Sequence, residues 1–61
     1  MNNKEGYCRC IRRNDKEFRV GHMYPYEIVR GRYVVDDPPA YSWSFDSKEE
    51  FNKYFREGFY L

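Results

Sequence analysis

The part of the chain that decides the fold is residues 41–51, YSWSFDSKEEF. Aromatic residues alternate with serines over residues 41–45, which is the period-two pattern of a strand with one buried face. The pattern then changes, because Ser47 is followed three residues later by Glu50, as in a capping box. We therefore predict a strand that ends near residue 45 and a helix that begins near residue 47.

The predicted helix has one apolar stripe. Phe51, Tyr54 and Phe55 are spaced i, i+3 and i+4, so all three would lie on one face of a helix. Gly58 favours a helix end shortly before it. The sequence thus predicts a helix over about residues 47–57, followed by a short apolar tail.

Three further strands are predicted before this region. Arg30-Gly31 is a short turn that would join two of them as a hairpin, and residues 18–20 alternate only briefly. Pro25 has no N–H to donate to a neighbouring strand, which favours an edge strand or a bulge at that position. The predicted strands are Gly6–Arg12, Met23–Val29 and Arg32–Asp36.

A chain of 61 residues has room for one small domain. Thirteen residues are Phe, Tyr or Trp, whereas Ile, Val and Leu together number seven, so the core must be built mainly from aromatic rings. We expect a single domain over residues 1–61, with residues 1–5 loose. Four or five short strands and one helix predict a small barrel or a strongly bent antiparallel sheet.

The spacing of the apolar residues and glycine in the first half resembles that of small SH3-like barrel proteins of bacteriophages and prophages. The resemblance covers about residues 7–37 and is carried by Tyr7, Ile11, Phe18, Gly21 and Tyr24, followed by the short hairpin and an acidic turn. That family is largely uncharacterised, so the resemblance implies no catalytic residues. Together with the predicted strands and helix, it leads us to expect an α+β fold: a small, strongly curved antiparallel sheet or SH3-like barrel of four to five strands with one C-terminal helix.

Charge is distributed unevenly along the chain. The net charge is +1, but residues 1–32 carry eight basic and four acidic residues, whereas residues 33–61 carry three basic and six acidic residues. Such asymmetry can mark an interaction face, although a solvated surface is the simpler interpretation. No apolar run is long enough for a transmembrane helix. The first residues have no apolar stretch typical of a signal peptide, so we expect a cytoplasmic protein, in the host cell if phage-encoded.

The sequence offers few groups for chemistry. In a reducing compartment Cys8 and Cys10 would be free thiols, and both would point into the core from one strand. Zinc would need two further ligands, and only His22 is available, so we expect no metal and no cofactor. Asp36 and Asp37 precede two prolines, as in an exposed turn. No phosphate-binding glycine loop is present. We expect no enzymatic activity.

Two kinds of binding remain open. Residues 41, 43 and 45 could stack on single-stranded bases, but a chain this poor in aliphatic residues needs those rings in its core. Seven tyrosines and seven arginines, residue types that dominate protein interfaces, favour contact with another protein. The candidate partner-binding residues are Arg12, Arg13, Arg30, Tyr33, Phe59 and Tyr60.

These observations together predict a non-enzymatic binding protein. With the resemblance, they suggest a phage- or prophage-encoded protein that binds a host protein and modulates or inhibits it. The alternative is a small nucleic-acid-binding barrel that uses basic residues against phosphates. A homo-oligomer also remains possible, and no membrane partner is expected. The basic residues of the alternative are Arg9, Arg12, Arg13, Lys16 and Arg19.

Overall fold

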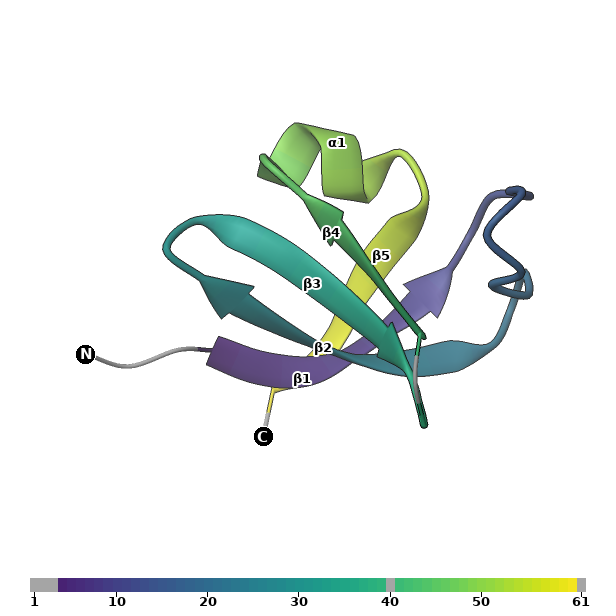
Figure 1. Ribbon diagram of the computed structural model, residues 1–61, viewed down its shortest axis with the longest axis horizontal. Helices are drawn as coiled ribbons and strands as arrows, with labels where there is room; N and C mark the ends of the chain where they lie inside the picture. The colour runs from purple at the N-terminus through teal and green to yellow at the C-terminus, as the bar shows by residue number, and fades with distance from the viewer. Residues whose placement is uncertain (1–3, 40, 61) are drawn as a thin grey trace.

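The computed structural model describes residues 4–39 and 41–60, without the side chains of residues 59 and 60. Its described part contains a five-stranded antiparallel sheet in the order β4-β3-β2-β1-β5 and one short helix (Figure 1). The small α+β architecture with a curved antiparallel sheet is therefore confirmed. The elements are β1 Lys4–Cys10, β2 Met23–Val29, β3 Arg32–Asp37, β4 Tyr41–Phe45, α1 Lys48–Asn52 and β5 Phe55–Tyr60.

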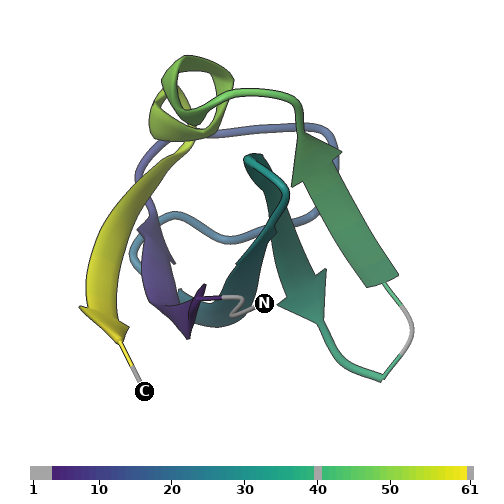
Figure 2. The same cartoon turned by 90° about the vertical axis from the view of Figure 1, so that its left-hand side faces the viewer.

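The sheet curls around a core of aromatic rings, and α1 lies across the open end between β4 and β5 (Figure 2). The rings of Trp43 and Phe45 on β4 lie 5.9 and 6.0 Å from the ring of Phe55 on β5, so the core joins the two outermost strands. No backbone pairing links β4 with β5 in the described sheet, which is therefore not closed. The buried core residues are Cys8, Cys10, Phe18, Tyr24, Tyr26, Tyr33, Val35, Phe45, Phe51 and Phe55.

The hairpin between β2 and β3 forms where the sequence predicted it. Arg30 and Gly31 have φ angles of 53° and 80°, the left-handed backbone that a two-residue turn between twisted strands requires. The first pair after the turn is Val29 with Arg32. The predicted strand at residues 41–45 is likewise confirmed, with Phe45 buried and Trp43 half-buried.

The helix is much shorter than predicted. α1 begins as expected, because the Ser47 hydroxyl accepts a hydrogen bond from the Glu50 N–H at 3.2 Å, but it ends at Asn52. Phe55 instead begins β5, where it pairs with Cys10 of β1. A helix over residues 47–57 would leave this edge of β1 without a partner, and pairing along β5 outweighs the local helical spacing.

Both ends of the described chain also differ from the expectation. Residues 1–5 were predicted to be loose, but Lys4 and Glu5 pair with Ile28 and Glu27 of β2, and residues 1–3 lie outside the described part. Gly58 lies within β5 instead of ending a helix. A Cβ atom at Gly58 would lie only 2.7 Å from the carbonyl oxygen of Tyr7, so β5 can approach β1 this closely only with glycine there.

Pro25 lies in β2, which is an inner strand of the sheet and not an edge strand. Its position is nevertheless compatible with a residue that lacks an N–H. Pro25 pairs with Tyr7 of β1, but pairing with β3 begins only one residue later, at Tyr26 and Val35. This end of β2 therefore has a neighbouring strand on one side alone.

Candidate functional site

Five side chains form a surface between the β1–β2 loop and β4, which we call the aromatic strip: Arg12, Phe18, Tyr41, Trp43 and Tyr54. The Phe18 ring lies 5.8 Å from Tyr41 and 5.9 Å from Trp43, and the Trp43 ring lies 4.8 Å from Tyr54. The Arg12 guanidinium lies over the Tyr54 ring at 5.9 Å, within the range of a cation–π contact. Tyr41 is 44% exposed, whereas Phe18 is buried and anchors the strip to the core.

Residues 11–22 form the loop that brings Arg12 and Phe18 to this place. Residues 18–20, which alternate in sequence, belong to this loop and not to a strand. The Asn14 amide donates to the carbonyl oxygens of Arg12 and Phe18, each at 3.0 Å. Its carbonyl oxygen accepts from the backbone N–H of Lys16 and Phe18 at 3.0 and 3.2 Å. One side chain thus replaces the strand pairing that this loop lacks.

The loop is joined to the strands by further backbone bonds. The Cys10 carbonyl accepts from Gly21 at 2.7 Å, and the Ile11 N–H donates to the Tyr54 carbonyl at 2.8 Å. The hydroxyl of Tyr24 accepts a hydrogen bond from the Arg19 N–H at 2.8 Å. The loop is therefore a defined surface, and Arg12 is held beside Tyr54.

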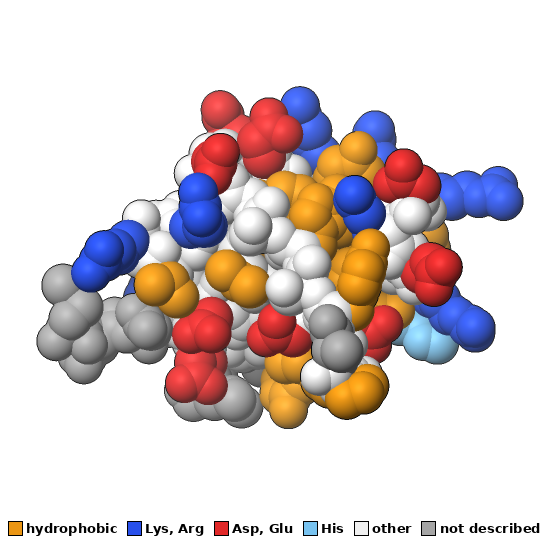
Figure 3. Space-filling model, in the orientation of Figure 1, with side chains coloured by type: hydrophobic (Ala, Val, Ile, Leu, Met, Phe, Trp, Pro, Cys, Tyr) orange, Lys and Arg blue, Asp and Glu red, His pale blue; other side chains and the backbone are white. Residues whose placement is uncertain are grey.

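A hollow lies at each end of β4, next to the aromatic strip. One is bordered by Trp43, Tyr54, Asp46 and Glu50, together with neighbouring residues of β4. The other is bordered by Tyr41, Asp36 and the prolines that flank it, Pro25, Pro38 and Pro39. In Figure 3 hydrophobic side chains gather between α1 and the loop, with Lys and Arg side chains among and around them. The surface could receive an extended segment of about 16 Å, the length of a five-residue strand.

The predicted partner-binding residues do not form one surface. Arg12 and Arg13 are exposed on the β1–β2 loop, whereas Arg30 lies in the β2–β3 turn. These two loops lie at opposite ends of β2 (Figure 1), roughly 20 Å apart along a seven-residue strand. Only Arg12 belongs to the aromatic strip.

Tyr33 was expected on the surface beside Arg30, but it faces the core and is only 8% exposed. Its ring lies 4.6 Å from Phe51 and stacks on Tyr26 at 6.3 Å. The register explains this, since Tyr33 pairs with Ile28, which shares the core side of β2 with Tyr26. Phe59 and Tyr60 belong to β5, and the prediction for their side chains falls outside the part that the structure describes.

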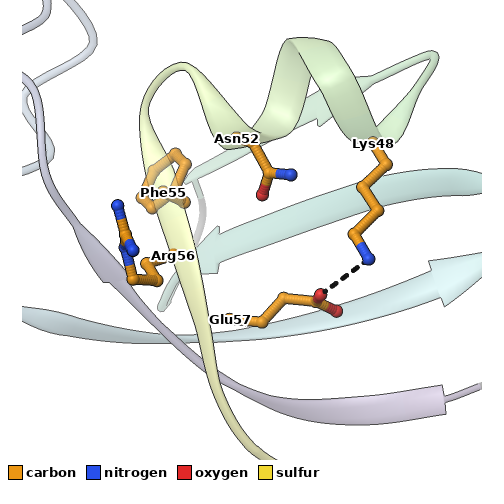
Figure 4. A pocket seen from close by; sticks show the side chains of 5 residues that line it. All are labelled: Lys48, Asn52, Phe55, Arg56 and Glu57. Atoms are coloured by element: carbon orange, nitrogen blue, oxygen red, sulfur yellow. Dashed lines mark ion pairs between the residues drawn. The ribbon is translucent and has the colours of Figure 1, made fainter.

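A polar hollow lies between α1 and β5, bordered by Lys48, Asn52, Phe55, Arg56 and Glu57 (Figure 4). Glu57 faces inward, and one carboxylate oxygen accepts a hydrogen bond from the Tyr26 hydroxyl at 2.8 Å. Its other oxygen lies 3.6 Å from the Lys48 ammonium. This cluster closes the core on the side of α1 with a carboxylate whose charge is balanced by its neighbours.

The two cysteines are free and fully buried, as the strand pattern predicted. Burial raises the pKa of Cys8 to about 12, with smaller contributions from the charges of Cys10 and Glu57. At neutral pH this thiol stays protonated and is a poor nucleophile. His22 is joined to Cys10 through the backbone, where its carbonyl accepts a hydrogen bond from the Cys10 N–H at 3.0 Å.

Within residues 4–39 and 41–60, no group of three or more His, Cys, Asp or Glu side chains lies close enough to hold a metal ion. Asp36 and Asp37 form the end of β3 and are half-buried beside the prolines.

Tyr41, Trp43 and Tyr54 were not among the predicted partner-binding residues. The sequence assigned the first two to the core and the third to a helical stripe. No local pattern marked these rings for the surface, because their exposure follows from the place of β4 as an outermost strand of the sheet.

Searches among protein families, curated proteins and solved structures found no match to this chain. None of the helices in the described part is both long and apolar enough to span a membrane.

Proposed function

We propose that this protein binds another protein through the aromatic strip and has no catalytic activity of its own. The observation that carries the proposal is the grouping of Arg12, Tyr41, Trp43 and Tyr54 on one side of an outermost strand. Arginine, tyrosine and tryptophan are the residue types that contribute most binding energy at protein interfaces. Here the three rings contact Phe18 or one another and Arg12 lies over Tyr54 before any partner binds, which lowers the entropic cost of association.

The charges around the aromatic strip and the free edge of β4 favour a protein partner over single-stranded nucleic acid. The hollows at the two ends of β4 are bordered by carboxylates, namely Asp36 at one end and Asp46 with Glu50, which pair with Arg32 and Lys53, at the other. Phosphate groups that followed the strip would approach these acids. An extended protein segment meets no such repulsion, and β4 has a free edge with which it could pair.

The source and the partner follow from the resemblance stated above and belong to the same proposal. A phage- or prophage-encoded protein of this size would act in the host cytoplasm by binding a host protein and modulating or inhibiting it. A barrel-like closure of the sheet is part of this proposal as well. It is supported by the ring contacts of Trp43 and Phe45 with Phe55, which join the outermost strands through the core.

The test is a capture experiment from host lysate, with and without nuclease, followed by a comparison of variants. The Arg12→Ala, Tyr41→Ser double variant should lose the captured protein. A matched control is the Arg30→Ala, Tyr7→Ser double variant, which removes the same residue types away from the strip, and Tyr7 is about as exposed as Tyr41, at 40% and 44%. Capture that survives the first variant, or that is lost equally in both, would contradict the assignment of the strip.

Nucleic acid is the second candidate, and one observation favours it. Arg56, from the acidic half of the chain, lies directly opposite Arg9 in the β1–β5 pairing, near the basic β1–β2 loop. The fold thus adds an arginine to the basic cluster predicted from sequence. If nuclease abolishes capture and the Arg12→Ala, Arg13→Ala variant abolishes binding to many nucleic acids, this second function replaces the first.

A further inference from the structure

The outer face of the sheet, which points away from the core, carries three rows of side chains across β2, β1 and β5. In the first row Arg9 pairs with Met23 on one side and with Arg56 on the other. In the middle row Tyr7 pairs with Pro25, and Gly58 lies beside Tyr7. In the third row Glu5 pairs with Glu27. Successive rows are therefore basic, apolar and acidic. We call them the arginine row, the apolar row and the glutamate row.

Both charged rows place like charges directly opposite each other. Cross-strand partners have Cβ atoms about 5 Å apart, and like charges at that distance destabilise a sheet. None of Arg9, Arg56, Glu5 and Glu27 forms an ion pair with another described residue. The isolated chain thus keeps two pairs of like charges on one face, about two rows apart, and neither pair is offset by an ion pair with another described residue.

Large apolar side chains lie exposed between and beside these pairs. Tyr7 is 40% exposed and Met23 is 41% exposed. A hollow bordered by Arg9, Met23, Arg56, Glu57 and Gly58 opens on the arginine row. It exists because Gly58 carries no side chain, as the close approach to Tyr7 requires. The arginine row thus borders a space that an acidic side chain could enter.

We propose that this face binds a second copy of the same chain. A two-fold axis that passes through Tyr7 and is inclined to the apolar row turns the second copy so that its Glu27 and Glu5 face Arg9 and Arg56 of the first, and the reverse contact forms by symmetry. Both repulsive pairs are then compensated, and Tyr7 of each copy is covered. An acidic partner of another kind would compensate the arginines but would leave Glu5 and Glu27 opposed.

The association is weak, because the face is small. Three strands about 4.8 Å apart and three rows about 6.8 Å apart cover roughly 300 Å² of each copy. This is less than half of a standard interface, so a dissociation constant on the order of 0.1–1 mM is expected. The contact lies on the outer face and is independent of the aromatic strip, so either proposal can fail without the other.

The experiment measures the mass of the full chain at about 1 mM by sedimentation equilibrium, where about half to four-fifths of the wild-type chains should be in dimers at the expected affinity. The Arg9→Glu, Arg56→Glu variant and the Glu5→Arg, Glu27→Arg variant should each be monomeric, because every facing contact becomes repulsive. The variant with all four substitutions keeps the net charge of +1 and exchanges the two rows, so it should dimerise like wild type. Like charges still face each other within each chain in every variant, so all variants should be about equally stable. Thermal unfolding checks this.

Mixing the two double variants should give a mixed dimer, because one then carries only acidic and the other only basic rows. The control pair is Arg13→Glu, Lys16→Glu mixed with Glu49→Arg, Glu50→Arg, which has the same net charges but changes no residue of the face. Association of the control pair to the same degree would mean attraction of net charge alone and would overturn the proposal. A monomeric wild type, a dimer insensitive to the double variants, or a fourfold variant that stays monomeric would also overturn it. The proposal would also be overturned if the wild type were monomeric and bound nucleic acid, and the Arg9→Glu, Arg56→Glu variant lost that binding.

Discussion

Asn14 illustrates how much of the candidate surface depends on one side chain. Its amide makes four hydrogen bonds with the backbone of residues 12–18, and these fix the loop that carries Arg12. Asn14→Ala should lower the free energy of unfolding by about 1–3 kcal/mol, because backbone groups lose their partners. Urea unfolding measures this, with Asn52→Ala as a control at an exposed amide for which no side-chain hydrogen bond is present in the described structure. Equal effects of the two substitutions would contradict the role of Asn14.

The buried thiol of Cys8 predicts how stability depends on alkaline pH. Its pKa is raised from 9.0 to about 12, so the folded state keeps the proton between these values while the unfolded state loses it. The free energy of unfolding should therefore be unaffected by this thiol below about pH 9. Above that value it should fall by up to about 1.4 kcal/mol per pH unit. Urea unfolding between pH 8 and 11 should show a shallower decline in Cys8→Ala than in wild type; identical slopes would show that the thiol is not protected.

Among the elements, β5 is the one that local sequence patterns did not predict. The spacing of Phe51, Tyr54 and Phe55 satisfies a helix, yet it also satisfies a single helical turn followed by a strand. The choice is made by β1, whose second edge pairs with β5, and pairing of segments distant in sequence leaves no local pattern. The strands at residues 23–29 and 41–45 were predictable because alternation is itself a local signal.

Gly58→Ala tests the approach of β5 to β1. The added Cβ would lie 2.7 Å from the Tyr7 carbonyl oxygen, so the backbone must shift. We expect a loss of about 1–3 kcal/mol in the free energy of unfolding, together with faster amide hydrogen exchange along β5. Arg56→Ala, two residues away and exposed, is the control and should not lower the free energy of unfolding, because it also removes the repulsion from Arg9. A Gly58→Ala protein as stable as wild type would mean that β5 does not pass this close to β1.

At the scale of the whole molecule, the sequence predicted the α+β class and the aromatic core but not the surface. Arg12 was predicted as a binding residue, yet Tyr54, which it contacts, comes from a segment about 40 residues further along the chain. Tyr41 joins the same surface through Phe18 of the loop, after the loop has folded against β4. The buried position of Tyr33, by contrast, follows from the hairpin that the sequence predicted, because the register of that hairpin places Tyr33 opposite Ile28 and therefore on the core side. The prediction grouped residues that are close in sequence, and it failed where alternation along a strand places neighbouring side chains on opposite faces of the sheet.

The central claim is that binding depends on the aromatic strip and not on phosphate contacts. The most direct test is the affinity for the purified partner, measured by isothermal titration calorimetry at low and high salt in wild type, Tyr41→Ser and Arg12→Ala. We expect an affinity that changes less than about tenfold between 50 and 200 mM salt. Each substitution should weaken it by about tenfold or more, equivalent to about 1.4 kcal/mol. An affinity that falls by about a thousandfold over that range and is unchanged in Tyr41→Ser would contradict the claim.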